Sequence, residues 1–268
     1  MARVITVTSG KGGVGKTTTT ANLGTALARY GARVALIDAD IGLRNLDVVM
    51  GLENRIVYDL VDVIEGRARV RQALIKDKRL PEMYLMPAAQ TRDKDAVNAE
   101  DMIALANEMH TDFDYILIDS PAGIESGFRN AIACANEVLI VTTPEVPSVR
   151  DADRVVGLVE ASEKGPPRLI INRIKPRLVS RGEMLSVDEV VEILAIEPIG
   201  VVPEDEVILS STNRGEAAVF NAQSIAGRAF DDIARRLRGE EVPFMDMSEQ
   251  PGVLERWFGG LFRRRAKA

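Results

Sequence analysis

A glycine-rich stretch near the start of the chain has the residue types and spacing of a phosphate-binding loop. Residues 10–17 read Gly-Lys-Gly-Gly-Val-Gly-Lys-Thr and match the pattern G-x-x-x-x-G-K-[ST] in full. Glycine has no Cβ, so backbone N–H groups can turn inward and approach phosphate oxygens closely. Lys16 would supply a cation to the β- and γ-phosphates, and Thr17 would offer its hydroxyl to Mg²⁺. The predicted contacts to a nucleoside triphosphate are Gly10, Lys11, Gly12, Gly13, Val14, Gly15, Lys16, Thr17 and Thr18.

Lys11 is a second lysine inside this loop, and the general pattern does not require it. One interpretation is a solvated side chain beside phosphates that Lys16 already serves. The other is a side chain that reaches a nucleotide in a facing subunit and neutralises charge there, as an arginine finger does. The residue types alone leave both interpretations open.

Three aspartates follow predicted strands and could complete the phosphate site. Asp119 comes directly after the apolar run 115–118, where a carboxylate can hold Mg²⁺ directly or through water. Asp38 and Asp40 end another strand and should lie near the same phosphates, where a carboxylate can bind a magnesium water or orient the attacking water. The simpler alternative is that these acids only cap turns between strand and loop.

Polar residues after two later strands are candidates for contact with the base of the nucleotide. Asn172 closes the apolar run "RLIIN", and its amide offers both a donor and an acceptor, which suits the edge of adenine. Pro203, Glu204 and Asp205 follow the last predicted strand and could flank the base. A plain turn explains these three residues nearly as well.

The elements that must position these residues alternate along the chain. We expect strands at residues 3–8, 33–37, 83–86, 115–118, 137–142, 168–172 and 198–202. We expect helices at residues 16–30, 58–64, 99–110, 148–163, 186–194 and 224–238. Several strands are apolar on both faces, which is typical of parallel strands covered by helices on two sides. The pattern predicts an α/β fold with a doubly wound, mostly parallel sheet and a ligand site at the carboxyl ends of its strands.

Composition excludes several classes of protein. The 268 residues are 46% hydrophobic and 28% charged, which is typical of a globular chain with a sizeable core. The single cysteine, Cys134, permits neither an internal disulfide nor a thiolate metal site within one subunit. We expect a reducing cytosolic compartment, because no signal peptide and no apolar run long enough to span a bilayer is present.

The charge is unevenly distributed, and the C-terminal end differs from the rest. Residues 252–268 carry five basic residues against Glu255 alone, so the net charge of −6 divides into +4 there and −10 for residues 1–251. Residues 239–251 are polar, acidic and broken by two prolines, which is typical of a linker. The chain therefore divides into a nucleotide-binding domain at 1–238, a linker at 239–251 and a C-terminal tip at 252–268.

The tip has the pattern of an amphipathic helix. On a helical projection its large apolar residues fall within one half of the circumference, and a basic run flanks them. This combination is typical of a helix that lies in the plane of an anionic membrane surface; the alternative is a terminal helix docked on the domain. The predicted membrane residues are Val253, Leu254, Trp257, Phe258, Leu261, Phe262, Arg263, Arg264 and Arg265.

The segment from Lys11 to Thr17 resembles the deviant Walker A motif of the MinD/ParA class of P-loop ATPases. Other segments are similar to the MinD family within that class, and the similarity extends over essentially the whole chain, including the tip. These segments lie at residues 38–60, 73–79, 87–96, 119–125 and 144–154.

The resemblance implies ATP and Mg²⁺ as cofactors and a homodimer that encloses two ATP molecules, with Lys11 acting across the interface. It implies a catalytic set of Lys11, Lys16 and Asp40, with Asp40 positioning the hydrolytic water, and metal ligands at Thr17, Asp38 and Asp119. Asn172 would contact the adenine, as the matching asparagine does in relatives. Glu145 and Asp151 lie on a segment that resembles the dimer-facing surface, and Asp151 is a candidate partner of Lys11.

The family also implies a place in the cell. Its members place the division septum, bind the cytoplasmic face of the cell membrane through such a tip, and work with an inhibitor like MinC and a stimulator like MinE. One short tip should hold a membrane only weakly, whereas two tips on one dimer raise retention by about 10²–10⁴. ATP-dependent dimerisation would then control membrane residence.

Other functions fit less well. A ParA-like partition ATPase binds DNA non-specifically, and a body at −10 argues against this without excluding a local basic patch. A flagellar-number ATPase would share the loop and an amphipathic end. An iron–sulfur ATPase of the nitrogenase reductase type needs four cysteines per dimer, and this chain would bring two. A metabolic ligase would have no use for Lys11 or the tip.

Overall fold

The structure is a computed structural model that describes residues 1–162 and 164–245. The predicted membrane residues between Val253 and Arg265, and residues 246–251 of the predicted linker, lie outside the described residues. Within the described ranges no helix is long and apolar enough to cross a membrane.

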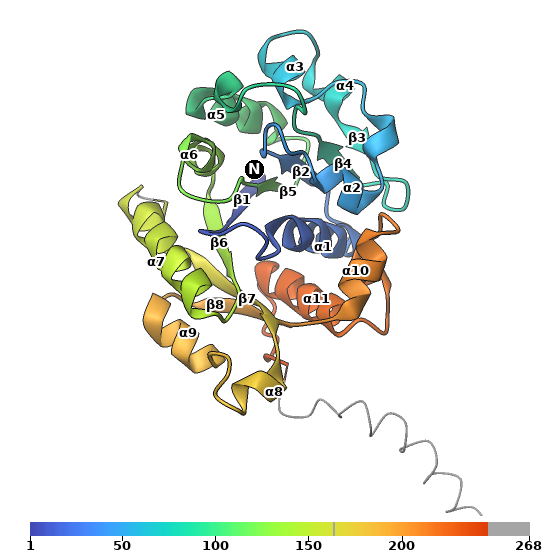
Figure 1. Cartoon of the computed structure of the whole chain (residues 1–268). Coiled ribbons are helices and arrows are strands. Elements are labelled where there is room, and N and C mark those ends of the chain that lie inside the picture. The colour runs from blue at the N-terminus through green and yellow to red at the C-terminus, as the bar shows by residue number, and fades with distance from the viewer. Residues whose placement is uncertain (163, 246–268) are drawn as a thin grey trace, which may run out of the picture.

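Eight strands form one sheet in the order β3-β4-β2-β5-β1-β6-β7-β8 (Figure 1). All neighbouring strands run parallel except β3, which pairs antiparallel with β4. The strands are β1 (Arg3–Thr8), β2 (Val34–Asp38), β3 (Ile75–Lys76), β4 (Met83–Met86), β5 (Tyr115–Asp119), β6 (Glu137–Thr142), β7 (Arg168–Ile174) and β8 (Pro198–Pro203). The predicted mostly parallel α/β sheet is confirmed.

Helices cover both faces of the sheet. In Figure 1, α1 and α11 lie on one face, and α5, α6, α7 and α9 lie on the other. The helices are α1 (Lys16–Arg29), α2 (Leu46–Met50), α3 (Leu60–Ile64), α4 (Val70–Ala73), α5 (Ala99–Met109), α6 (Ser126–Ala133), α7 (Val146–Ala161), α8 (Pro176–Val179), α9 (Val187–Leu194), α10 (Glu206–Thr212) and α11 (Ile225–Leu237).

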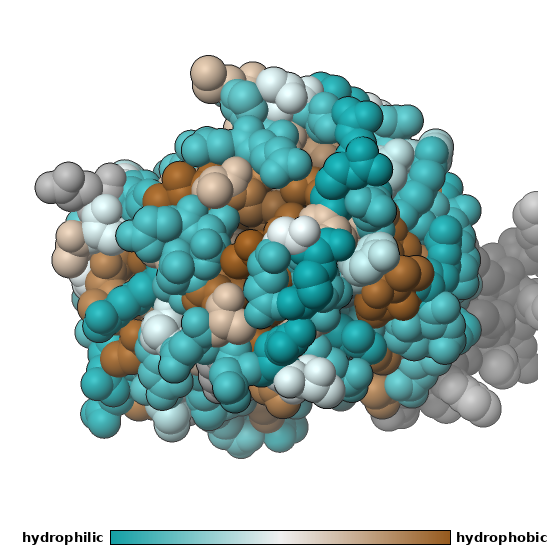
Figure 2. All heavy atoms as spheres, turned by 90° about the horizontal axis from the view of Figure 1, so that it is seen from above, coloured by the Kyte–Doolittle hydropathy of each residue, from teal (hydrophilic) through white to brown (hydrophobic). Residues whose placement is uncertain are grey.

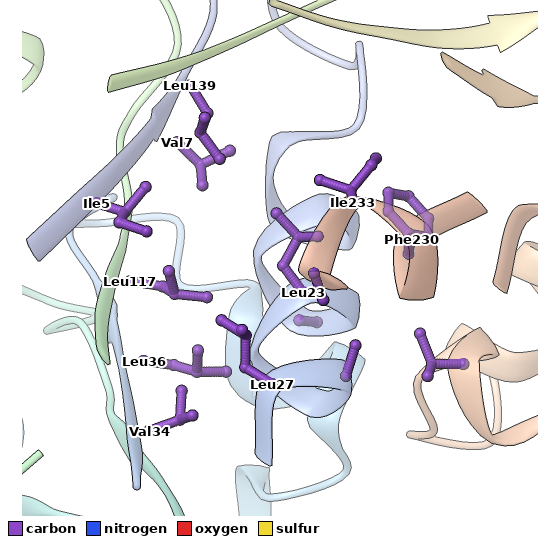
Figure 3. Packing of buried hydrophobic residues seen from close by; sticks show 14 of the residues in the cluster. Ile5, Val7, Leu23, Leu27, Val34, Leu36, Leu117, Leu139, Phe230 and Ile233 are labelled. Carbon is purple, nitrogen blue, oxygen red and sulfur yellow. The ribbon is translucent and has the colours of Figure 1, made fainter. Parts of the chain in front are cut away.

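The core on the α1 side is a continuous apolar layer between the sheet and two helices. Figure 3 shows Leu23 and Leu27 of α1 between strand residues such as Ile5 and Leu117 and the α11 residue Phe230. All five side chains are fully or almost fully buried. Burial on both faces explains why the strands contain continuous apolar runs instead of alternating ones.

The outer surface is mostly hydrophilic. Figure 2 looks onto the end of the molecule that carries α3, α4 and α5 and shows polar side chains over most of it, with separate hydrophobic patches between them.

The seven predicted strands are confirmed, with ends that differ by at most two residues. The six predicted helices are confirmed with similar small shifts; for example, α7 begins at Val146 instead of residue 148 because Pro147 fits the first turn of a helix. The sequence prediction missed β3 and the helices α2, α4, α6, α8 and α10. All but α6 are at most seven residues long, too short for a clear apolar periodicity.

Residues 242–244 lie against α11 and β8. The guanidinium of Arg236 donates to the backbone oxygens of Val242 at 2.9 Å, Pro243 at 2.7 Å and Ile199 at 3.0 Å. It also lies over the ring of Phe244, 4.3 Å from its centroid. One arginine thus attaches this segment to the first half of β8.

Candidate nucleotide-binding site

The predicted phosphate loop connects β1 to α1, and α1 begins at Lys16 as predicted. Gly15 has φ +101°, a left-handed conformation that L side chains rarely adopt. A Cβ at this position would lie 2.3 Å from the side-chain amide nitrogen of Asn172. Glycine is therefore required at Gly15 both by its conformation and by the close approach of β7.

Lys16 lies at the start of α1 with its side chain 8% exposed. Burial lowers the pKa of its ammonium group, and the carboxylates of Asp119 and Asp40 act in the opposite direction. The ammonium is therefore held close to two acids at the end of the sheet where the phosphate loop lies. A buried ammonium in this setting is available to the oxygens of a bound phosphate.

Asp38 and Asp119 end neighbouring parallel strands and stand opposite each other in the register of β2 and β5. Burial raises the pKa of Asp119 to about 8, with the charge of Asp38 as the next cause, and a hydrogen bond from Thr17 lowers it. Burial likewise raises the pKa of Asp38 to about 6, although the backbone N–H groups of Leu46, Asp40 and Asn45 donate to it. Two buried carboxylates with raised pKa values fit a site that a divalent cation completes.

The candidate ligands at this site suit Mg²⁺ better than they suit a metal ion that is held by protein side chains alone. Among the residues that the structure describes, no group of three or more His, Cys, Asp or Glu side chains could hold a metal. Mg²⁺ binds through one or two carboxylates, water and substrate phosphates. The hydroxyl of Thr17 and the carboxylates of Asp38 and Asp119 can supply the protein's share.

Asp40 lies just beyond the carboxyl end of β2, and its backbone N–H donates to Asp38 Oδ1 at 3.0 Å. Its side chain is partly exposed. The hydrogen bond holds the start of the loop after β2 beside the two buried carboxylates.

A cavity of about 700 Å³ opens beside the phosphate loop. The predicted residues Gly15, Thr18, Asn172, Pro203, Glu204 and Asp205 all line it, so the fold brings together three separate parts of the sequence. Further lining residues on the strand–helix connections and on α10 and α11 were not predicted from the sequence. These are Arg173, Glu206, Ile208, Leu209, Ser210, Thr212, Asn213 and Phe230.

The α10 residues could have been predicted from the position of a helix directly after the last parallel strand. A strand followed by a helix-capping aspartate places the first turn of that helix at the ligand end of the sheet. Asp205 has this capping role, because its Oδ1 accepts a hydrogen bond from the N–H of Val207 at 3.0 Å. Its Oδ2 accepts from the hydroxyl of Ser224 and thereby also fixes the start of α11.

Asn172 connects β7 to the phosphate loop. Its amide nitrogen donates to the backbone oxygen of Val14 at 2.8 Å, and its amide oxygen accepts from the N–H of Arg173 at 2.9 Å. From the sequence we expected this amide at the adenine edge. In the structure it lines the cavity and at the same time holds the loop through which phosphate would be bound.

Lys11 is exposed at the surface beside α7. The preceding residue, Gly10, contacts the main chain of Asp151 in α7, and Glu145 occupies the N-cap position of the same helix. The two predicted interface acids and Lys11 therefore lie on the same side of the domain, around the phosphate loop.

Comparisons with known proteins agree with this geometry. The family model described as the CobQ/CobB/MinD/ParA nucleotide binding domain matches residues 5–219. The chain is 57% identical over 247 residues to the septum site-determining protein MinD of Synechocystis sp., a match that covers 92% of this chain and 93% of that protein.

Two solved structures have the same fold. A chain of the MinC:MinD cell division protein complex of Aquifex aeolicus aligns with a TM-score of 0.85 and 52% identity, covering 91% of this chain and 99% of that chain. The septum site-determining protein MinD of Pyrococcus horikoshii, complexed with Mg-ADP, aligns with a TM-score of 0.80 and 29% identity, covering 88% and 96%. From its phosphate loop, its strand order and these matches, the chain belongs to the MinD family of P-loop nucleotide-binding ATPases.

Proposed function

We propose that the protein is a Mg²⁺-dependent ATPase that acts as a membrane-associated switch in placing the division septum. The observation that carries the enzymatic part is the convergence of Lys16, Asp38 and Asp119 beside a loop built for phosphate. Mg²⁺ would neutralise charge on the transferred phosphoryl group. Thr17, Asp38 and Asp119 would hold it there, and Lys16 would contact the β- and γ-phosphate oxygens.

Asp40 is the residue that we assign to orienting the attacking water. It lies next to the buried carboxylates but is itself partly exposed, so water can reach it. Asn172, Pro203 and Asp205 line the cavity in which the adenine would lie. Residues are thus available to bind the phosphates, Mg²⁺, the attacking water and the adenine base.

We further propose an ATP-dependent homodimer in which Lys11 reaches the nucleotide of the facing subunit. Lys11 is exposed, and Lys16 already serves the phosphates of its own loop. Asp151 is the candidate partner of Lys11 across that interface. Because each subunit contributes a tip, dimerisation raises membrane retention by about 10²–10⁴ over a single tip. Hydrolysis would separate the subunits and release the protein.

The cellular role follows from the family. The relatives are septum site-determining proteins, and one solved relative is a MinC:MinD complex. We propose that this chain recruits a MinC-like division inhibitor, responds to a MinE-like stimulator and works at the cytoplasmic face of the cell membrane. A ParA-like positioning ATPase that binds DNA instead of a membrane is the alternative.

Co-sedimentation with anionic lipid vesicles tests the proposal. Wild-type protein should pellet with ATP and not with ADP, and Trp257→Glu together with Phe258→Glu in the full chain should abolish pelleting while ATP binding remains. Lys11→Ala should also abolish it, because the dimer is lost. ATP-dependent pelleting of the Lys11→Ala variant would contradict the switch.

A further inference from the structure

Arg173 lines the nucleotide cavity, and the proposed chemistry does not use it. Its backbone has φ +59°, in the left-handed region that residues other than glycine and asparagine rarely adopt. Among the residues that the structure describes, two other non-glycine residues have a positive φ, Arg44 and Ala195. A backbone of this kind persists where the surrounding structure or the function requires it, so each of the three needs a reason.

The other two residues have structural reasons. Ala195 is the C-cap of α9, and a left-handed residue commonly ends a helix. The guanidinium of Arg44 forms an ion pair with the buried carboxylate of Asp47 at 3.0 Å. Arg173 lies within a strand, and within residues 1–162 and 164–245 its guanidinium has no ion pair and no hydrogen bond. The contacts of its side chain therefore do not explain its backbone conformation.

A β-bulge in β7 leaves Arg173 exposed at the cavity. Ile171 pairs with Val201 of β8 and Ile174 pairs with Pro203, so three residue steps on β7 match two on β8. Because of the extra residue, Arg173 is exposed between two buried neighbours of the same strand. Bulges are frequent next to functional sites, where they redirect one side chain. The residue that the bulge exposes here is one that lines the nucleotide cavity.

The bulge lies beside the part of the cavity in which we place the adenine. The N–H of Glu204 donates to the backbone oxygen of Ile174 at 3.0 Å, so the connection after β8 adjoins the bulge. Arg173 is the only cation among the described residues that line the cavity, and three acids line it after β8, namely Glu204, Asp205 and Glu206. Their charge disfavours a phosphate on this side of the cavity, but not an uncharged base.

We propose that the guanidinium of Arg173 stacks on the adenine of the bound nucleotide and favours purine over pyrimidine bases. The contact rests on the proposed position of the adenine in this cavity. A planar guanidinium stacks on aromatic faces, which an ammonium group does not do in the same way. A cation over an aromatic ring strengthens binding by about 3- to 30-fold, depending on how far the contact is removed from water.

The test uses four full-length variants. Arg173→Asn removes the guanidinium and tolerates the left-handed backbone, and Arg173→Gly adopts that backbone freely. Arg173→Lys keeps the charge without the planar group. The matched control is Arg177→Gln, which removes an exposed arginine of α8 that does not line the cavity. All variants keep the backbone N–H of residue 173 that donates to Asn172.

The affinities for ATP and UTP are measured by competition against a fluorescent ATP analogue. Arg173→Asn and Arg173→Gly should bind ATP roughly fivefold to tenfold more weakly than wild type. They should lose less affinity for UTP, because a pyrimidine offers a smaller aromatic face, so the preference for ATP over UTP should fall. Arg173→Lys should also bind ATP more weakly, and Arg177→Gln should bind both nucleotides as wild type does.

Thermal unfolding without nucleotide separates this contact from a structural role. The unfolding midpoints of Arg173→Asn and Arg173→Gly should not fall below that of wild type, because the guanidinium has no partner to lose within the described residues. A large fall in both midpoints would assign Arg173 to the fold and overturn the proposal.

The binding outcomes separate the contact from the proposed function. If wild type binds ATP and the variants at position 173 bind it equally well, the contact is wrong and the nucleotide site stands. An equal loss of affinity for ATP and UTP would assign Arg173 to the ribose or the phosphates and overturn the base contact. Wild-type affinity in Arg173→Lys would overturn stacking by the planar group, and an equal loss in Arg177→Gln would reduce the effect to total charge. If wild type fails to bind ATP, the proposed function itself fails.

Discussion

Gly10 of the phosphate loop lies directly against the main chain of Asp151 in α7. A Cβ built on Gly10 would lie 2.2 Å from the carbonyl oxygen of Asp151 and 2.8 Å from its Cβ. A side chain at position 10 would therefore push the phosphate loop and α7 apart. We infer from this close contact that the position of α7 is coupled to that of the nucleotide site.

Gly10→Ala should displace the loop from α7, with a loss of roughly 1–3 kcal/mol in stability and a larger loss of nucleotide affinity. Thermal unfolding and binding of a fluorescent ATP analogue measure the two effects. Gly157→Ala in the same helix is the control, since no atom lies within 4 Å of its added Cβ. That variant should gain about 0.5–1 kcal/mol. Wild-type nucleotide affinity in Gly10→Ala would contradict the coupling.

Asp119 should make the binding of Mg-nucleotide dependent on pH. Burial raises its pKa to about 8, so below that pH the carboxyl is largely neutral and must lose a proton to bind a cation. Affinity should therefore fall as pH drops from about 8 toward 6, by up to about tenfold per unit. Calorimetry in buffers of different ionisation enthalpy would detect the released proton, and Asp119→Asn should abolish both the proton release and the metal dependence.

The same shift has the opposite effect on the nucleotide-free protein. A raised pKa in the folded state means that unfolding releases a proton between the ordinary value of 3.8 and about 8, so stability contributed by Asp119 is lost as pH rises through this window. Asp119→Asn should then be more stable than wild type at pH values near 8 and should differ less near pH 4. If wild type and Asp119→Asn showed the same dependence of the unfolding midpoint on pH, the pKa of Asp119 would not be raised.

Asn172→Ala should weaken nucleotide binding more than it weakens the fold. The substitution removes the hydrogen bond that holds the backbone oxygen of Val14 in the phosphate loop. Asn130→Ala is a matched control, because Asn130 makes a similar bond to the backbone oxygen of Val97 away from the cavity. Both variants should lose about 1 kcal/mol in unfolding free energy, and only Asn172→Ala should bind ATP more weakly. If Asn172→Ala and Asn130→Ala changed ATP binding equally, the role assigned to Asn172 in holding the phosphate loop would be wrong.

Arg236→Ala should release residues 242–244 from β8. The loss of its hydrogen bonds to backbone oxygens should cost about 1–3 kcal/mol and make this segment sensitive to limited proteolysis. Arg228→Ala on the exposed side of the same helix is the control and should leave both properties unchanged. ATP turnover should remain at the wild-type level in both variants.

The local features of the site could be predicted from the sequence because each depends on a short run of residues. The phosphate loop is a contiguous motif, and the strands β5 and β6 are apolar on both faces, which identifies buried parallel strands. The candidate acids and the amide were found because they follow such strands, where parallel sheets bind ligands.

Other features depend on contacts between distant residues. The register that places Asp38 opposite Asp119 requires a strand order in which β2 and β5 are neighbours, although they are far apart in the sequence. The cavity wall from α10 was missed because a helix of seven residues shows no clear periodicity. No residue pattern in either segment indicates the close approach of Gly10 to Asp151.

The sequence by itself thus determined the chemistry available to this protein, namely which residues can bind phosphate, Mg²⁺ and a base, since these are properties of side chains and of local backbone. Only the tertiary structure decided which of these groups meet, how deeply they are buried and which cations remain without an acidic partner. The reason is that burial and pairing arise when helices and strands distant in the chain pack together, and the pKa values and charged surfaces follow from that packing.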